Sequence, residues 1–163
     1  MGSFSNIKEY IDLNIGFLEE NYNNEDEKGY KSIYHFLKKE GSEFNIVDIK
    51  YTEEGIIKEC FKNSLDLCFT NQEKYIYTEG YTITFGLPIL HAWITTTDGK
   101  IIDPTIRKHE KVGSEYFGVQ FDFNYVIETT NEKKTYGILD NYQMGFPILT
   151  GEHKKEDWKY KKD

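Results

Sequence analysis

The sequence is poor in cysteine and in proline, and the shortage of cysteine excludes a disulfide-stapled fold. Two cysteines and three prolines occur among 163 residues. Small secreted domains depend on several disulfides, which two cysteines cannot supply. On a shared helix, Cys60 and Cys68 would lie about 12 Å apart, beyond disulfide reach. We therefore expect a protein of the reducing cytoplasm.

Positive charge and long apolar runs are also scarce. The chain carries 20 basic and 28 acidic residues, for a net charge of −8. Without a basic stripe we expect no nucleic-acid partner. The lysine-rich stretch 154–162 is interrupted by acidic residues and is typical of a solvated face. No apolar run approaches the roughly 20 residues that span a bilayer, and no signal-peptide pattern is present, so we expect no membrane partner.

Aromatic residues are plentiful instead. They make up 16% of the chain, with 13 Tyr and 11 Phe, which supports a packed core despite the modest apolar content. Neither a repeat nor a linker is visible. The sequence predicts a single domain over residues 1–163.

Hydrophobic spacing predicts an α+β fold with helices segregated from an antiparallel sheet. Helices are expected at 7–20, 30–39 and 59–70, the second ending at Gly41. Strands are expected at 44–51, 74–86, 90–96 and 101–105. Residues 113–121 suggest a loop with a short extended piece. Short helices are expected at 124–132, where a strand is the alternative, and at 136–141.

The helix expected at 59–70 separates the two cysteines by position. Phe61, Leu65, Cys68 and Phe69 form one apolar stripe, which predicts that Cys68 is a core residue. Cys60 lies about 100° off that stripe, in the first turn. We expect Cys60 to open to a cleft. Unpaired N–H groups at a helix start favour a thiolate and can bind an oxyanion.

His91 and Asp103 are placed to complete a catalytic group with Cys60. A thiol nucleophile needs an imidazole to take its proton and a carboxylate to orient that imidazole. With a three-residue turn at 97–99, Trp93 pairs with Asp103 and the two side chains share a face; with a two-residue turn they do not. Gly99 suits the three-residue turn. Ordinary structural roles stay open: an incidental cysteine, a satisfied sheet histidine and a strand-ending Asp-Pro.

Four short motifs resemble the transglutaminase-like cysteine enzymes of the papain-like superfamily. Cys60, "EGY" at 79–81, "HAW" at 91–93 and "DPT" at 103–105 follow their order and approximate spacing. Small phage and bacterial members are similar in their "C-x-x-N" helix and "YFG" segment, here Cys60, Asn63 and 116–118. The resemblance covers about 58–121. It implies a papain-like core, with Cys60 as nucleophile, His91 as base and Asp103 as orienting residue.

One departure concerns the oxyanion. Papain-like enzymes usually carry a glutamine before the nucleophile, and "TEEGIIKE" at 52–59 has none. Donors beyond the Cys60 backbone are therefore open. Three supporting residues are considered. Asn63 either contributes to the site or, as we favour, ties the helix to a strand. Glu79 either orients a ring or backbone group near the site or, with Gly80, marks a bulge. Trp93 belongs to the "HAW" motif.

Two functions are compatible with these residues. The first is a cysteine acyl-transfer enzyme acting on an amide, isopeptide or thioester of a protein or small molecule, by hydrolysis, deamidation or transamidation. The second is a non-catalytic binding or inhibitor protein on the same fold, for example a phage protein that binds a host factor. We expect no cofactor and no metal, because the histidines His35, His109 and His153 lack ligand spacing with the cysteines.

Overall fold

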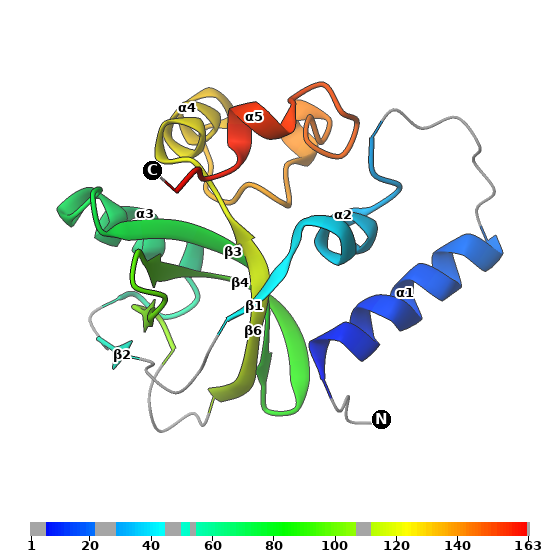
Figure 1. Cartoon of the computed structure of the whole chain (residues 1–163), viewed down its shortest axis with the longest axis horizontal. Coiled ribbons are helices and arrows are strands. Elements are labelled where there is room, and N and C mark those ends of the chain that lie inside the picture. The colour runs from blue at the N-terminus through cyan, green and yellow to red at the C-terminus, as the bar shows by residue number, and fades with distance from the viewer. Residues whose placement is uncertain (1–5, 22–28, 45–49, 53–54, 107–111, 163) are drawn as a thin grey trace.

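A computed structural model describes residues 6–21, 29–44, 50–52, 55–106 and 112–162. It is an α+β structure in which helices pack against a twisted sheet (Figure 1). The helices are α1 (Ile7–Asn21), α2 (Ile33–Glu40), α3 (Cys60–Thr70), α4 (Phe123–Lys133) and α5 (Lys155–Trp158), with a 3-10 turn η2 (Tyr142–Met144). The strands are β1 (Ser42–Phe44), β2 (Lys50–Tyr51), β3 (Tyr75–Thr84), β4 (Leu87–Thr96), β5 (Ile101–Asp103) and β6 (Val112–Gln120).

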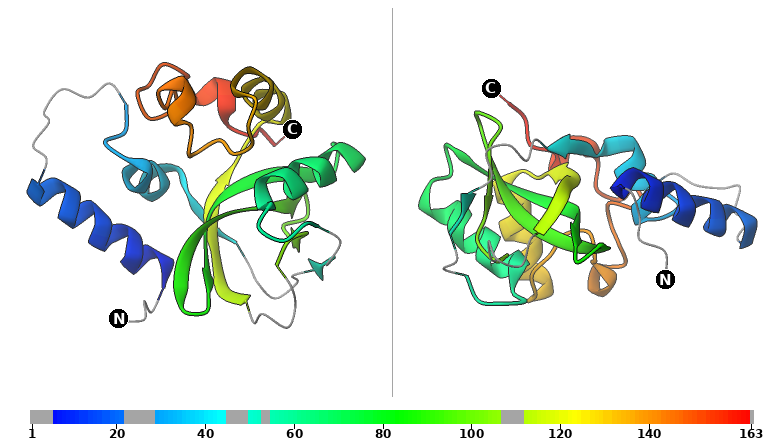
Figure 2. Two further views of the ribbon diagram at one scale, coloured as in Figure 1. Left: turned by 180° about the vertical axis from the view of Figure 1, so that it is seen from behind. Right: turned by 90° about the horizontal axis from the view of Figure 1, so that it is seen from below.

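The strands form one sheet in the order β1-β6-β3-β4-β5-β2. Neighbours are antiparallel except for β2 and β5, which run parallel. The ten-residue strands β3 and β4 form its central hairpin, whose twist is visible in Figure 2. Within the described residues, no helix is long and apolar enough to cross a membrane.

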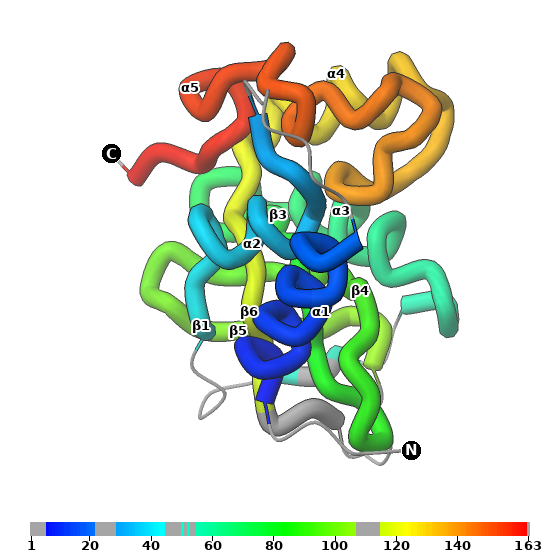
Figure 3. Tube along the Cα trace, turned by 90° about the vertical axis from the view of Figure 1, so that its right-hand side faces the viewer, coloured from blue at the N-terminus to red at the C-terminus, as the bar shows by residue number. Residues whose placement is uncertain are grey.

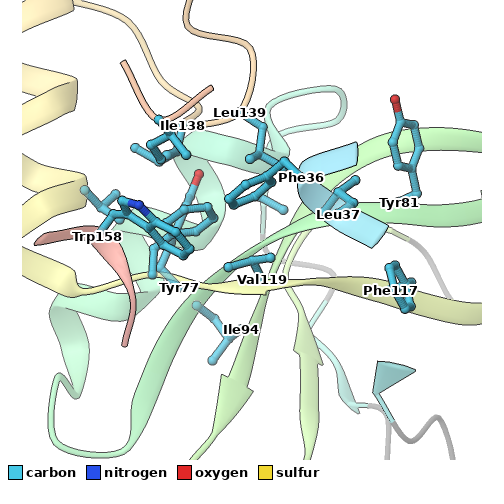
Figure 4. Close-up of a cluster of buried hydrophobic side chains, with 14 of the residues drawn as sticks. Phe36, Leu37, Tyr77, Tyr81, Ile94, Phe117, Val119, Ile138, Leu139 and Trp158 are labelled. Carbon is cyan, nitrogen blue, oxygen red and sulfur yellow. The ribbon is translucent and has the colours of Figure 1, made fainter. Parts of the chain in front are cut away.

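The helices share one face of the sheet, where the main core lies. Alternate residues of β3, β4 and β6, among them Tyr77, Ile94 and Val119, point to this face and pack with residues of α1 to α4. Figure 3 shows α1 and α2 in front of the sheet, and Figure 4 shows part of the packed cluster. Strand residues at the intervening positions therefore face the other way.

The opposite face holds a smaller cluster of Trp93, Ile101 and Tyr116, against which Phe44 packs. Glycines make room for it. Gly80 and Gly118 pair across β3 and β6, and a Cβ at Gly80 would lie 2.1 Å from the Phe117 carbonyl oxygen. Side chains at these two positions would force the strands apart.

The helices expected in the first hundred residues and the strands expected at 74–86 and 90–96 are confirmed. The single strand expected at 44–51 is wrong, because β1 and β2 lie at opposite edges of the sheet; residues 45–49 lie outside the described residues. Two later expectations are wrong. Residues 112–120 form the full strand β6, with neighbours on both sides, instead of a loop with a short extended piece. Residues 136–141 are not helical, since Ile138 and Leu139 donate their N–H groups to the Glu79 carboxylate instead of to helical carbonyls. At 123–133 the helix is correct and the strand alternative is wrong.

Two glycine substitutions should have opposite effects. A Cβ at Gly118 would lie 2.3 Å from the Glu79 carbonyl oxygen and 2.7 Å from the Trp93 ring, so Gly118→Ala should lower the free energy of unfolding by roughly 1–3 kcal/mol. Gly16 in α1 has nothing within 4 Å of that position. Gly16→Ala should therefore stabilise the protein by about 0.5–1 kcal/mol. Urea unfolding measures both; equal effects would contradict the close packing of β3 and β6.

Candidate functional site

The β4–β5 hairpin places His91 and Asp103 on one face of the sheet. Ile94 pairs with Ile102, and the same antiparallel register places Trp93 opposite Asp103. The turn is the three-residue form: Gly99 has a φ of +87° and the Thr96 N–H donates to the Lys100 carbonyl. The predicted register is thus confirmed, and it puts both side chains on the face opposite Ile94 and the main core.

The two side chains form a buried hydrogen-bonded pair. His91 Nε2 lies 2.7 Å from Asp103 Oδ2, with 2% and 0% of the two residues exposed. Asp103 Oδ1 accepts the backbone N–H groups of Thr105 and Ile106, both at 2.9 Å. The hydroxyl of Tyr116 donates to Oδ2 at 2.8 Å. Each carboxylate oxygen therefore accepts two hydrogen bonds, which suits a buried negative charge.

Charge pairing outweighs burial at both groups. Burial raises the pKa of Asp103, but the His91 charge and hydrogen bond, with the Ile106 and Thr105 N–H groups, hold it below its ordinary value. Burial lowers the pKa of His91, but Asp103, followed by the hydrogen bond and charge of Cys60, raises it to about 10. The arrangement favours imidazolium beside carboxylate.

Cys60 approaches the same histidine from the first turn of α3. Its side chain interacts with His91 and contributes to the raised pKa of the imidazole. Since Nε2 is engaged by Asp103, Nδ1 is the ring nitrogen left for the sulfur. The N-cap residue Glu59 makes no side-chain capping bond, so the side chain does not occupy the first-turn N–H groups. These groups can stabilise an anion at the helix start.

Burial corrects two expectations about this helix. Cys60 is 8% exposed, so it is covered instead of opening to a cleft as expected. Phe69, expected in the apolar stripe, is 53% exposed, because the buried face follows the line of Cys60, Ser64 and Cys68. Helical residues four apart lie on one face, so Cys60 belongs to the buried face it was expected to leave.

Cys68 is a core residue, as predicted. It is fully buried, and burial raises the pKa of its thiol to about 12. Its Sγ lies 3.8 Å from the Tyr75 carbonyl oxygen, to which it donates. A thiol in this state is a poor nucleophile near neutral pH.

Asn63 ties α3 to its surroundings. Its Nδ2 donates to the Ile56 carbonyl at 2.7 Å and to Thr105 Oγ1 at 2.8 Å, and its Oδ1 accepts the Ile56 N–H. These bonds use its amide to join the loop before Cys60 to the chain after Asp103. These hydrogen bonds agree with the structural role that the sequence favours for Asn63.

Glu79 is fully buried on the helix-bearing face, away from His91 and Asp103. It accepts the Tyr77 hydroxyl at 2.6 Å and the N–H groups of Ile138 and Leu139. It thus orients a ring and a backbone segment, but on the face opposite His91 and Asp103 instead of near the site as expected. The bulge at Gly80 is wrong, because pairing with β4 is unbroken there and the register shift with β6 falls between Thr82 and Thr84.

Trp93 and Tyr116 surround the pair. The Trp93 ring stacks beside His91 with centroids 6.3 Å apart and meets the Tyr116 ring edge-on at 5.1 Å. Tyr116 was singled out in the sequence only as part of "YFG"; its bond to Asp103 was missed. A strand predicted at 112–120 would have placed Tyr116 on the same face as His91 and Asp103, but the sequence predicted a loop with a short extended piece there.

No group of three or more potential metal ligands among His, Cys, Asp and Glu occurs in the part of the chain that the structure describes.

Comparison with protein-family models, with curated proteins and with solved structures gives no significant match in any of the three. The likeness to transglutaminase-like enzymes stays a resemblance of short motifs. A functional proposal must accordingly depend on the geometry of Cys60, His91 and Asp103.

The His91–Asp103 pair predicts a pH dependence of stability. Because folding raises the His91 pKa, the stabilisation is fully present below about pH 6.5, the ordinary value, and is lost as pH rises through about 10. Between these limits the free energy of unfolding should fall more steeply in the wild type than in His91→Gln.

Urea unfolding at a series of pH values measures both slopes. His153→Gln is the matched control, since His153 bonds to the Tyr125 hydroxyl, away from this pair. A wild-type slope equal to that of His91→Gln would show that the pair does not stabilise the fold through its charge.

Proposed function

We propose that the protein is a cysteine-dependent acyl-transfer enzyme in which Cys60, His91 and Asp103 form the catalytic triad. The observation that carries the proposal is the chain of contacts from Cys60 to His91 and from His91 Nε2 to Asp103 Oδ2. A buried histidine with a carboxylate on one nitrogen and a thiol on the other is the arrangement needed to activate a sulfur nucleophile.

The reaction would begin with His91 as the imidazolium that Asp103 favours, carrying on Nδ1 the proton given up by the Cys60 thiol. The Cys60 sulfur then attacks the carbonyl carbon of the substrate, and the carbonyl oxygen becomes an oxyanion. First-turn N–H groups of α3, beginning with Cys60, are the donors nearest to that charge. His91 returns the proton to the leaving amine or thiol, which leaves a thioester on Cys60.

A second nucleophile would release the acyl group. Water gives hydrolysis, or deamidation of a primary amide, and an amine gives transamidation. The proposed substrates are therefore amides, isopeptides or thioesters of proteins or small molecules. A nucleophile on a helix start facing a histidine and an aspartate on adjacent antiparallel strands also supports assignment to the papain-like, transglutaminase-type folds.

The burial of Cys60 favours one alternative. A thiol that is 8% exposed beside a histidine that is 2% exposed is also what a binding or inhibitor protein on an inherited enzyme fold would retain. The partner would be a protein, for example a host factor. Chemical reactivity of the thiol separates the two functions.

Acetylation by p-nitrophenyl acetate tests the proposal directly. Wild-type protein should release a burst of nitrophenolate and gain one acetyl group on Cys60, located by peptide mass spectrometry. Cys60→Ala should lose both signals. Cys68→Ala is the matched control and should keep them, because Cys68 is fully buried with a raised pKa. Acetylation of Cys68 in preference to Cys60, or none at either thiol, would reject the enzyme and favour the binding protein.

Asp103→Asn should keep the fold and slow acylation by roughly 10²- to 10⁴-fold. The asparagine Oδ1 can still accept the Thr105 and Ile106 N–H groups. Its amide nitrogen in place of Oδ2 would turn His91 Nε2 into an acceptor, which leaves the ring proton on Nδ1 facing Cys60. Stopped-flow rates and a thermal melt measure the two effects; an unchanged rate would remove Asp103 from the triad.

A further inference from the structure

Tyr116 reaches the triad from a distant strand. Its hydroxyl donates to Asp103 Oδ2 at 2.8 Å, the same oxygen that lies 2.7 Å from His91 Nε2. In the sheet, β6 and β5 are separated by β3 and β4. Three strand spacings correspond to about 14 Å in a flat sheet. The contact therefore requires a long side chain and a sheet curved toward this face.

The ring has little freedom to swing away. Tyr116 is fully buried, its ring meets Trp93 edge-on at 5.1 Å, and its backbone pairs with Phe44 on one side and Thr82 on the other. The ring centroid lies 6.5 Å from that of His91. The hydroxyl is thus held on Asp103 by packing on neighbouring strands.

Oδ2 must divide its charge between two donors. A carboxylate oxygen that accepts two hydrogen bonds is a weaker partner for each of them, because each donor withdraws electron density from the same atom. Among the described residues, the titratable groups that act on His91 are Cys60 from α3, Asp103 from β5 and, through Asp103, Tyr116 from β6. Of these, Tyr116 is the one that competes with the imidazole for the carboxylate.

We propose that Tyr116 is a positioning residue for the triad, whose hydroxyl fixes the Asp103 carboxylate and limits its hold on His91 so that the imidazole can both take and return the Cys60 proton. This inference rests on the proposed acyl transfer. Without the Tyr116 hydroxyl, Asp103 binds the His91 imidazolium more tightly. His91 then returns its proton to the leaving group more slowly. The reaction would then lose rate without losing the fold.

The competing explanation is that the bond only holds the curved sheet together. A purely structural bond would change stability when removed, but not the hydrogen bond between His91 and Asp103. The readout must therefore report on His91 itself.

Tyr116→Phe removes the hydroxyl and keeps the ring. Tyr81→Phe is the matched control, because Tyr81 is a buried tyrosine of β3 whose ring packs with Tyr10 and Tyr34 on the helix-bearing face. In Tyr116→Phe, the NMR resonance of the His91 Nε2 proton should move downfield. Acylation by p-nitroacetanilide, whose amine leaving group must take a proton as it departs, should slow by about 10-fold at pH 7. Tyr81→Phe should show neither change.

A double-mutant cycle isolates the route through Asp103. In an Asp103→Asn background, Tyr116→Phe should no longer affect the acylation rate, because the carboxylate through which it acts is gone. An undiminished effect in that background would overturn the proposal. So would a resonance and a rate in Tyr116→Phe that match Tyr81→Phe, and in that case wild-type acylation would still support the proposed function.

The failure of the proposed function gives a different pattern. If Cys60 is not acylated in the wild type but the His91 resonance still depends on Tyr116, acyl transfer is wrong and the positioning of the pair stands. Should Tyr116→Phe not fold, the wild-type protein provides the measurement: its Tyr116 hydroxyl proton should give a downfield resonance that is lost in Asp103→Asn. A hydroxyl resonance indifferent to Asp103→Asn would overturn the inference.

Discussion

The buried pairing of His91 with Asp103 is the interaction on which the rest of the arrangement depends. Removing two charges from water costs several kcal/mol for each ion unless hydrogen bonds replace the lost solvent. Asp103 obtains them from three places: its own strand end at Thr105 and Ile106, the neighbouring strand at His91, and the distant strand β6 at Tyr116. A flat sheet could not supply the last of these. The buried charge of Asp103 therefore receives its full set of hydrogen bonds only because the sheet is curved.

Small residues allow that curvature where the strands are most crowded. Gly80 pairs with His91 on one side and with Gly118 on the other. Neither glycine projects a side chain into the face that holds the pair, and the Trp93 ring lies close over Gly118. The "EGY" and "YFG" motifs thus each place a glycine beside the buried pair. The motifs noticed in the sequence are explained here by packing, independently of any catalytic role.

Much of this site was predictable from local rules. Gly99 selects the three-residue turn, the turn sets the register, and the register puts His91 and Asp103 on one face. The helix start at Cys60 follows from spacing alone. What could not be predicted depends on contacts distant in sequence. Tyr116 reaches Asp103 across two strands. Residues 136–141 are not helical because Ile138 and Leu139 donate their N–H groups to Glu79, about sixty positions earlier in the chain.

The buried carboxylates of Asp103 and Glu79 have different surroundings and different pKa shifts. Asp103 faces a group that can be cationic, and its pKa is lowered despite burial. Glu79 is bonded to the neutral donors Tyr77, Leu139 and Ile138, and burial outweighs them, so its pKa is raised. A carboxylate without a charged partner at hydrogen-bond distance has no proton acceptor to tune, but it can hold chain segments together. Glu79 accepts hydrogen bonds from residues 138–139 and from the Tyr77 hydroxyl. Asp103 therefore acts on an ionisable side chain, while Glu79 joins the 138–139 segment to the sheet from the opposite face.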